Sequence, residues 1–276
     1  MQINYVYLYL ISPLHTGGTT QEGNLLGIAR ESHTDLPYIP SSTIRGRLRS
    51  FVDNKGLRDR LFGTDLKESS QLEQGAIWVG DGALLWLPVP SLSHGVVWVS
   101  SPMLLRRWLR FNGTKTNPPP EYSCNIKKGN SSVYLKDAIL KADELQDWSD
   151  WKEFVPQTLE ASAIERVMVL PDQHCATLIQ MSLWRQVKVK LDGTKSVDGG
   201  FRYEEAIPPD TLMYFSWGIT SQANGKANQS DTAETPDKAS NSSTDFQNLL
   251  TNNSIMQIGG QESLGRGFVS LRMNDE

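Results

Sequence analysis

At 276 residues the chain is long enough to bury one large hydrophobic core or two modest ones. A formal net charge of -4 and a pI near 5.7 exclude a protein that is basic throughout, so a nucleic-acid-binding surface would have to be local. Two cysteines, Cys124 and Cys175, cannot build a disulfide framework and predict a reducing, cytoplasmic environment. The opening stretch MQINYVYLYLIS has no basic leader and is too short to span a bilayer, so we expect no contact with a membrane.

The hydrophobic pattern predicts an α+β fold with more strand than helix. The apolar run at 3–11 is typical of a strand covered on both faces, and a loop rich in Gly, Thr and Asn is expected at 15–30. A short strand at 36–39 and a helix from Pro40 to about Val52 come next. The elements expected further along are two strands within 75–89, a strand at 96–99, a helix from 101, a short helix and a strand within 160–169, a buried strand at 212–219 and a C-terminal strand.

Three stretches lie outside this regular pattern. Residues 112–130 contain three consecutive prolines and are expected to form a loop. Residues 135–145 fit a strand or a helix, and the sequence does not decide between them. Residues 221–245 are rich in Ser, Thr, Asn, Ala and Asp and nearly free of large apolar side chains, which predicts a disordered insertion.

A long β-hairpin is predicted at about 186–207. Its first strand alternates, so that Val187 and Val189 face one way while Lys188 and Lys190 face the other. A polar turn at 192–200 then leads into the returning strand. Lysines on such a strand serve either to bind RNA or to prevent edge-to-edge aggregation, and the sequence leaves both roles open.

The standard catalytic motifs are absent. Gly260 and Gly265 have the spacing of a nucleotide-binding loop, but Arg266 and Gly267 stand where lysine and a hydroxyl residue are required. The chain has neither HExxH nor GxSxG. Its four histidines are scattered through the sequence: His15, His33, His94 and His174. Only the last has a neighbouring cysteine, and adjacent strand residues point to opposite faces, so no metal site is predicted.

A basic helix is the clearest charged feature. Arg45, Arg47 and Arg49 lie in the stretch SSTIRGRLRS, and the first and last of them are one turn apart on the same face. Ser41 and Ser42 at the helix start offer hydroxyls beside free backbone N–H groups, which together favour a phosphate. The arrangement predicts a phosphate-binding site, although a solvated helix face without a ligand has the same composition.

Glycines indicate close backbone approach at two places. Gly46 lies inside the basic helix, where it costs about 1 kcal/mol relative to alanine, and we expect another backbone to come near it. The closing segment GGQESLGRG combines a fixed charge with glycines that allow positive φ and a concave array of N–H groups: Gly259, Gly260, Gly265, Arg266 and Gly267. A hairpin loop that binds nothing is an equally good interpretation of this segment alone.

Together these segments resemble the RAMP superfamily, and specifically the backbone subunit of Cmr-type (type III-B) CRISPR complexes. The stretches that carry the resemblance are PLHTGG, ARESHTDLPYIPSSTIRGRLRS, RLFG, GAIWVGDGALLWLPVPSL, VVWVSSPMLLRRWLR, RYEEAIPPDTLMYF and MQIGGQESLGRGFV. Their order and spacing are specific to the family, and only 112–160 and 221–245 fall outside them. The resemblance implies a single RAMP domain over 1–276, with a ferredoxin-like or RRM-related palm, large insertions at those two places and a protruding thumb at about 186–207.

The resemblance also implies partners and contacts. Family members stack in several copies along a guide RNA, present it to a target RNA and are capped by other CRISPR subunits. Guide phosphates would be held at the first helix and near the glycine-rich loop, and the thumb would push between bases. The residues expected at the RNA on these grounds and on the charge pattern are Ser41, Ser42, Arg45, Arg47, Arg49, Lys188, Lys190, Gly259, Gly260, Gly265, Arg266 and Gly267. RNA binding would need no cofactor.

One departure from the family affects the chemistry. The family's loop after the histidine usually carries an aspartate that is needed to cut target RNA, whereas this chain has Leu26 and Gly27 there. Neither residue has a side-chain group that can orient a 2′-hydroxyl or hold a divalent ion. His15, Glu22, Glu31 and Asp35 are the nearby weak candidates for catalysis, and magnesium would be needed only if cleavage occurs.

Three functions therefore stay open from the sequence. The chain is expected to be a guide-RNA-binding structural subunit with weak or no nuclease activity. A second hypothesis is a competent target-RNA endonuclease that uses a displaced acidic residue. A third, from another class, is an enzyme that binds a phosphorylated small ligand through its glycine-rich loops.

Overall fold

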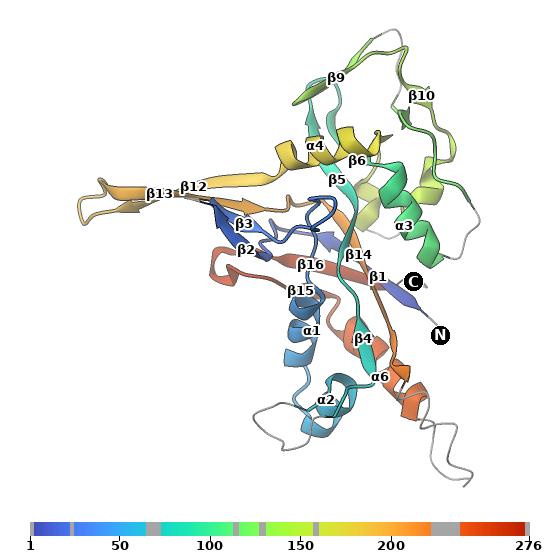
Figure 1. Ribbon diagram of the computed structural model, residues 1–276, viewed down its shortest axis with the longest axis vertical. Coiled ribbons are helices and arrows are strands. Elements are labelled where there is room, and N and C mark those ends of the chain that lie inside the picture. The colour runs from blue at the N-terminus through green and yellow to red at the C-terminus, as the bar shows by residue number, and fades with distance from the viewer. Residues whose placement is uncertain are drawn as a thin grey trace.

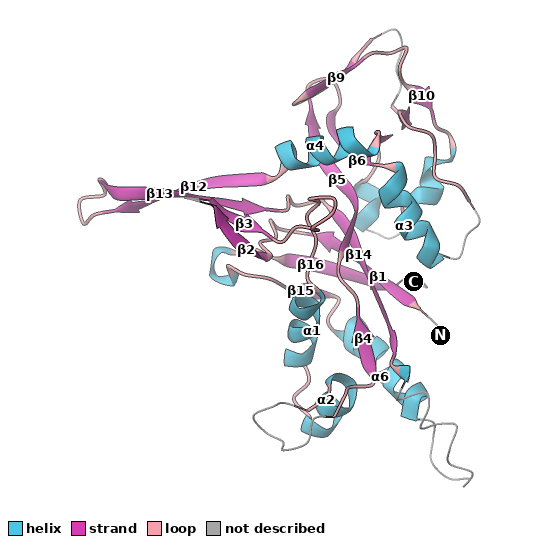
Figure 2. Cartoon of the chain, in the orientation of Figure 1, coloured by secondary structure: helices cyan, strands magenta, loops and turns pink. Residues whose placement is uncertain are grey.

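The computed structural model describes residues 3–22, 25–64, 73–112, 116–126, 131–156, 160–221 and 238–273. Helices and strands form one mixed α/β body, from which a long hairpin projects to one side (Figure 1). Strands outweigh helices in this described part, as predicted (Figure 2). None of its helices is long and apolar enough to cross a membrane.

Four strands form the centre of the main sheet, in the order β5-β14-β1-β16, and each is antiparallel to its neighbours. Their bounds are β1 Asn4–Leu10, β5 Ala83–Ser91, β14 Leu212–Ile219 and β16 Phe268–Met273. Alternate residues of β1 belong to different cores, with Val6 and Leu8 in one and Tyr5 and Tyr7 in the other. Since successive strand residues point to opposite faces, β1 is covered on both sides, as predicted.

Helices of the lower half in Figure 1 cover one end of this sheet. They are α1 Ser41–Ser50, α2 Lys55–Phe62 and α6 Lys238–Asn252, and all three contact the short strand β4 Ile77–Val79. The short strand β15 Ile255–Gln257 follows α6 and pairs with β16. Phe246 of α6 is fully buried, and its ring centroid lies 4.8 Å from that of Trp217 and 6.1 Å from that of Phe62. This aromatic contact fixes α2 and α6 to the sheet.

The upper half in Figure 1 extends the sheet beyond β5. Its elements are β6 Gly95–Ser100, α3 Pro102–Asn112, β7 Ser123–Cys124, β8 Val133–Leu135, β9 Ala138–Leu140, β10 Gln146–Asp147, η1 Asp150–Phe154, η2 Glu160–Ala163, β11 Val167–Val169 and α4 Asp172–Ser182. Two buried tryptophans hold this part together: Trp86 Nε1 donates to the Phe154 carbonyl at 2.9 Å, and Trp108 Nε1 donates to the Tyr7 hydroxyl at 3.1 Å.

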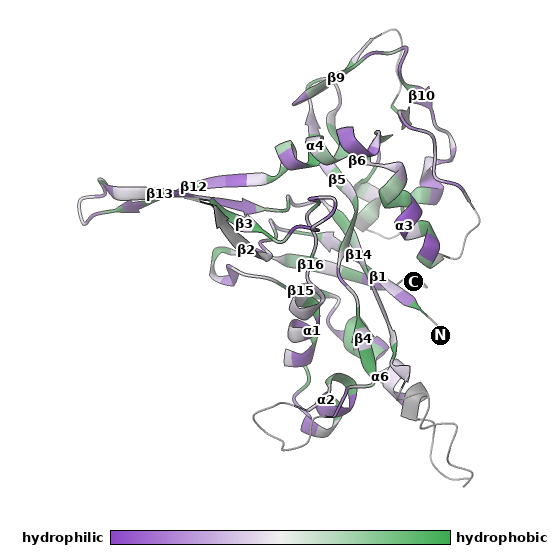
Figure 3. Cartoon of the chain, in the orientation of Figure 1, coloured by the Kyte–Doolittle hydropathy of each residue, from purple (hydrophilic) through white to green (hydrophobic). Residues whose placement is uncertain are grey.

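The projecting hairpin confirms the long hairpin predicted from alternation. It consists of β12 Trp184–Leu191 and β13 Val197–Ala206, which belong to a small sheet of order β12-β13-β3-β2 with β3 Leu25–Ile28 and β2 Gly17–Glu22. Most of the hairpin is exposed, and only the last three residues of β13 are buried. Figure 3 shows the start of β12 in purple, in contrast to the green of β4 in the body. We call this hairpin, residues 184–206, the thumb.

Several sequence predictions differ from the structure. Residues 36–39 form only isolated bridges, Arg30↔Pro37 and Ile39↔Gly82, and the predicted loop at 15–30 contains β2 and β3. Residues 135–145 contain a strand, β9, and the predicted loop at 112–130 holds the short β7. Disorder is wrong for 238–245, because α6 starts at Lys238 and is anchored by Phe246; residues 222–237 lie outside the described part. Helices α2 and α4 were not predicted.

Candidate nucleic-acid interface

The start of α1 differs from the free helix terminus that the sequence predicts. Pro40 is the N-cap, and the backbone N–H of Ser41 donates to Asp81 Oδ1 at 2.6 Å. A carboxylate therefore already occupies one donor of this helix end, where negative charge is favoured. Ser42 is exposed beside it. Apart from α1's own backbone, no atom of the described residues lies within 4 Å of a Cβ added at Gly46. The outer surface of α1 is thus open, but its N-terminus is not an empty anion site.

Arg45 and Arg49 are used inside the protein. Arg45 Nη2 donates to the carbonyl of Phe62, and Arg49 Nη1 donates to the carbonyl of Gly63 at 2.7 Å, both at the C-terminal end of α2. Cations at this end stabilise a helix because they satisfy its last carbonyls and its dipole. Burial and the charge of Arg49 lower the pKa of Arg45. These two side chains hold α2 onto α1.

Replacing Arg49 by alanine should therefore affect folding more than RNA binding. We expect the free energy of unfolding to fall by about 1.5–3 kcal/mol, the value typical of hydrogen bonds from a charged donor. Urea denaturation measures this change. Arg106→Ala, which removes an exposed arginine from α3, is the matched control and should change stability little. Equal stability of the two variants would contradict the capping role.

Arg47 points to a different neighbour. Its guanidinium carbon lies 4.7 Å from the centroid of the Phe51 ring, and its Nη2 lies 3.9 Å from Glu262 Oε1. The side chain is about one-third exposed. Glu262 belongs to η3 Glu262–Leu264, in the glycine-rich loop. Arg47 is therefore the arginine of the basic helix that faces both solvent and that loop.

The glycine-rich loop needs its glycines for close packing. Gly259, Gly265 and Gly267 have positive φ, as the sequence predicts. A Cβ at Gly267 would lie 1.9 Å from the Ile258 carbonyl oxygen, and one at Gly259 would lie 2.5 Å from that of His15. Gly260 donates its N–H to the same His15 carbonyl at 2.9 Å. The loop is thereby folded tightly against the segment that follows β1.

Arg266 of this loop is buried rather than presented to solvent. It is 4% exposed, and its guanidinium donates to Gln186 Oε1 at 2.7 Å and to Gln261 Oε1 at 2.5 Å. Its Nη1 also lies 3.4 Å from Glu204 Oε2. The arginine therefore joins the loop to the root of the thumb.

Glu204 also forms ion pairs with the other cations of this region. Lys188 Nζ lies 2.7 Å from Glu204 Oε2 and Arg202 Nη2 lies 2.9 Å from Oε1, while the carboxylate itself is fully buried. Burial opposes ionisation, but the hydrogen bond from Lys188 and the charges of Lys188, Arg202 and Arg266 outweigh it, so the pKa of Glu204 is lowered. Lys188 is accordingly neutralised within the chain.

The outer thumb has one polar and one apolar face. Lys190 is three-quarters exposed and pairs with Asp198 at 2.9 Å, and at the tip Asp192 Oδ1 accepts from the N–H groups of Thr194 and Ser196. The Thr194 hydroxyl also donates to Asp192 Oδ1. All three hydrogen bonds lower the pKa of Asp192, and the bond from the hydroxyl has the largest effect. The opposite face exposes large apolar side chains in cross-strand pairs: Val187 with Tyr203, Val189 with Phe201 and Leu191 with Val197. Exposed aromatic rings on a projecting hairpin are suited to stacking on bases.

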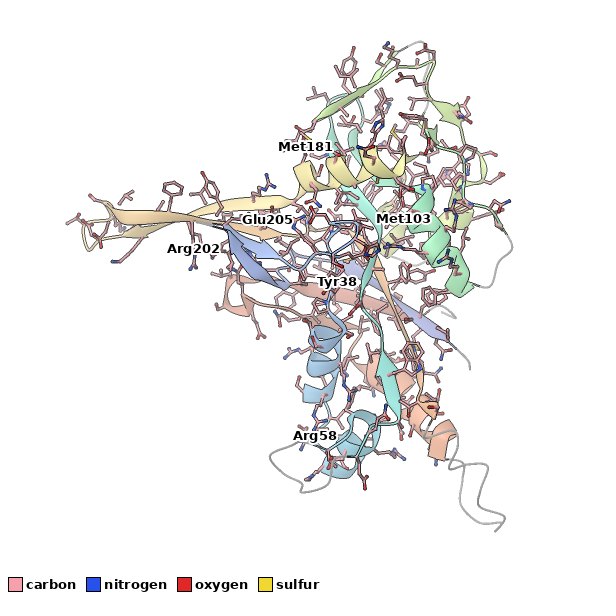
Figure 4. All side chains as sticks on the ribbon, in the orientation of Figure 1. Tyr38, Arg58, Met103, Met181, Arg202 and Glu205 are labelled. Carbon is pink, nitrogen blue, oxygen red and sulfur yellow. The ribbon has the colours of Figure 1, made fainter. Side chains whose placement is uncertain are left out.

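Glu205 contacts two arginines through its carboxylate and His15 through its backbone carbonyl. Glu205 is 1% exposed and pairs with Arg30 Nη2 at 2.7 Å and with Arg185 at 3.0 Å. The buried His15 donates from Nδ1 to the Glu205 carbonyl at 2.8 Å. In Figure 4 Glu205 lies where the thumb leaves the body, and Arg202 lies farther out on the hairpin. This hydrogen bond gives the His15 side chain a structural role.

A cavity of about 760 Å³ opens beside Glu205. Its lining includes Gly27, Arg30, Asp35, Tyr38 and Arg185. Asp35 is exposed and has the left-handed φ of 57°. Glu31 also lines this cavity, but its side chain is only 19% exposed, against 72% for that of Asp35.

The remaining acidic candidates are placed differently. Glu31 is engaged by Arg107 Nη1 at 2.9 and 3.0 Å and by the Thr34 hydroxyl at 2.5 Å. Glu22 ends β2, and its side chain lies outside the described part. Within the described part, no three His, Cys, Asp or Glu side chains are grouped as a metal site.

Leu26 and Gly27 occupy neighbouring positions of β3. Leu26 is the register partner of Glu204, whereas Gly27 lines the cavity together with Glu205. Because paired residues of adjacent strands point to the same face, Leu26 faces the side of the glycine-rich loop and Gly27 faces the cavity. Both positions lack a carboxylate, as the sequence shows.

Sequence reasoning missed the residues that organise the thumb root. Glu204, Glu205, Arg30 and Arg185 had no assigned role. The available signal was a pair of adjacent glutamates directly before a buried segment, since a carboxylate is rarely buried without a cation. Their partners come from distant segments and cannot be read from spacing.

Comparison with known proteins agrees with the resemblance. The sequence profile of the RAMP superfamily matches residues 7–270. The chain belongs to the RAMP superfamily. A curated relative, the CRISPR system Cmr endoribonuclease Cmr4 of Pyrococcus furiosus, is 28% identical over an alignment that covers 100% of this chain and 97% of the relative.

Two solved structures show the same fold. Oligomeric Cmr4 from Pyrococcus furiosus superposes with a TM-score of 0.69 at 24% identity, covering 99% of this chain and 98% of that one. A chain of type III-B Cmr-beta bound to cognate target RNA gives 0.73 at 19% identity, covering 99% and 97%. This RAMP protein therefore has the Cmr4 fold along its whole length.

Proposed function

We propose that this RAMP protein is a guide-RNA-binding backbone subunit of a type III-B CRISPR effector complex. Several copies would stack along one guide RNA, with other subunits of the complex, and present it to a target RNA. The relatives support this, because one is an oligomeric Cmr4 and another is a chain of a Cmr complex bound to target RNA. Two buried free cysteines suit the reducing cytoplasm in which we place it.

The palm of this subunit is proposed to be ferredoxin-like. Its four central strands follow the order β5-β14-β1-β16 with antiparallel pairing throughout. Helix α1 lies between β1 and β5 in the sequence, and α6 lies between β14 and β16. This order of strands and helices supports a split βαβ arrangement. The thumb and the upper half are then insertions into the palm.

One observation carries the functional proposal: α1, the glycine-rich loop and the root of the thumb contact one another in turn. Arg47 of α1 reaches Glu262 of the glycine-rich loop, and Arg266 of that loop reaches Glu204 at the thumb root. Exposed groups border this line on α1 and on the thumb, with open space at Gly46. A strand of RNA would follow the line from helix to thumb.

The division of labour among the cations follows from their partners. We propose that Ser42 and Arg47 contact guide phosphates and that Lys190 with the apolar thumb face contacts bases or a neighbouring copy. Arg45, Arg49, Lys188 and Arg266 would support this surface from within, because their partners are carbonyls at the end of α2 or the buried Glu204. Arg47 and Lys190 instead pair with the exposed carboxylates of Glu262 and Asp198. A local surface of this kind is compatible with the acidic pI.

Substituting Arg47 tests the proposed phosphate contact. In Arg47→Ala, we expect weaker binding of a short single-stranded RNA and a salt dependence of log K that is shallower by about 0.7, as for one lost phosphate contact. Filter binding at several salt concentrations measures both. Arg106→Ala removes the same charge from α3 and should leave the slope unchanged. An unchanged slope in Arg47→Ala would remove this residue from the interface.

A second candidate function has one observation in its favour. The cavity next to β3 is lined by three acidic residues and two arginines: Glu31, Asp35, Glu205, Arg30 and Arg185. Of the three acids, Asp35 has the most exposed side chain. If the chain cuts target RNA, we propose Asp35 as the displaced acid, with magnesium as the required metal ion. Binding of a phosphorylated small ligand has less support, because Arg266 of the glycine-rich loop is buried.

A further inference from the structure

The thumb changes from exposed to buried at two consecutive glutamates. Residues 197–203 of β13 are exposed, whereas Glu204 is 0% and Glu205 1% exposed. Successive strand residues point to opposite faces, so the two carboxylates enter the body on opposite sides of one strand. A buried carboxylate is stable only with cations or hydrogen-bond donors around it.

Each glutamate joins a cation of the thumb to a group of the body. On one face Glu204 pairs with Lys188 and Arg202 of the thumb and also with Arg266, while Gln261 Nε2 donates to its Oε2 at 3.0 Å. Both Gln261 and Arg266 belong to the glycine-rich loop.

The opposite face repeats this pattern with different segments. Glu205 pairs with Arg185 of the thumb and with Arg30, which follows β3. Arg30 Nη1 in turn donates to Gln180 Oε1 of α4. The thumb root is therefore tied to the loop on one side and to β3 and α4 on the other.

We propose that Glu204 and Glu205 are positioning residues that fix the direction in which the thumb leaves the palm. β13 pairs with β3 at Tyr203 and Glu204, but the rest of the two-stranded hairpin is exposed and has few other contacts to hold its direction. Two ion-pair clusters on opposite faces resist bending in both directions. For RNA the consequence, which rests on the proposed function, is that the thumb meets the strand at one fixed place relative to α1.

Distance measurements on the protein without RNA test this directly. Spin labels would be attached at Gly193→Cys on the thumb tip and at Asp53→Cys or Asp137→Cys on the body; all three positions are exposed. Cys124 and Cys175 are buried and do not compete for the label. Pulsed electron–electron double resonance then gives the distribution of the distance between the two labels.

We call the two ion-pair clusters of Glu204 and Glu205 the clamp. With the clamp unmodified, each pair of labels should give one narrow distribution of distances. In Glu204→Gln and in Glu205→Gln, we expect the distributions to broaden at least twofold. Glu204→Gln combined with Arg266→Gln removes both charges, so it keeps the test decisive if the single variant does not fold. The matched control is Asp198→Asn, which removes a carboxylate from the same strand but from the surface pair with Lys190.

Unchanged widths in folded clamp variants would overturn the proposal, and so would equal broadening in the Asp198→Asn control. Circular dichroism melting identifies the folded variants. Chemical probing of bound RNA provides a second arm, in which base reactivity near the thumb should spread over more positions in the clamp variants. Failure to bind RNA at all would contradict the proposed function and leave the distance result intact.

Discussion

Target RNA complementary to the guide is expected to bind complexes assembled from this chain and to be cut slowly or not at all. The positions that would carry an acidic group in β3 are Leu26 and Gly27, and the buried His15 is engaged with the Glu205 carbonyl. A catalytic acid or base typically contributes two to four orders of magnitude in rate, so we expect a deficit of about that size relative to a competent nuclease.

Single-turnover cleavage of labelled target RNA with magnesium measures this deficit. Leu26→Asp should raise the rate, and comparison with Gly27→Asp tells whether the face of Glu204 or the cavity face matters. Leu92→Asp adds the same charge to an exposed turn and is the control. Fast, regularly spaced cleavage by the unmodified chain would contradict the expectation, and Asp35 and Glu22 would then be the acids to substitute.

Glu204→Ala should lower the free energy of unfolding by about 3–5 kcal/mol, the range for a broken buried ion pair. The reason is that Arg266, which is 4% exposed, would keep its charge without a carboxylate. Urea denaturation measures the loss, and adding Arg266→Leu should recover most of it. Asp198→Ala, at an exposed pair, should cost less than about 1 kcal/mol.

The contribution of Glu204 to the free energy of unfolding should depend on pH. Because the pKa of Glu204 is lowered in the folded chain, its ionised form stabilises the fold above its ordinary value of 4.5. This contribution disappears as pH falls through the lowered pKa. Equal losses for Glu204→Ala and Asp198→Ala at neutral pH would show that the cluster is not a stabilising element.

Local patterns predicted much of the fold. Alternation at 187–191 predicted the thumb, and the helical spacing of Ile44 and Leu48 predicted α1, because both depend on which face of one element is apolar. Helix α4 had a comparable signal, since Cys175, Leu178 and Ile179 are buried at helical spacing, but it was overlooked.

The site was predictable only in outline. Sequence placed the basic helix, the glycine-rich loop and the thumb in the interface, yet it assigned charges to RNA that the fold uses internally. Arg45 donates to a carbonyl that lies 17 positions away in the sequence. Arg266 pairs with the carboxylate of Glu204, at a separation of 62 positions. A charge pattern shows which residues are cations, whereas their partners depend on the tertiary fold.

The nucleic acid that accompanies the assembled protein tests the central claim most directly. The chain would be expressed with the other subunits of its complex, purified at high salt and extracted, and the recovered RNA sequenced. We predict short RNAs of discrete lengths from a repeat-containing locus, with less RNA recovered for Arg47→Ala than for Arg106→Ala. Recovery of no RNA, or of random cellular RNA in equal amount from both variants, would contradict a guide-binding role.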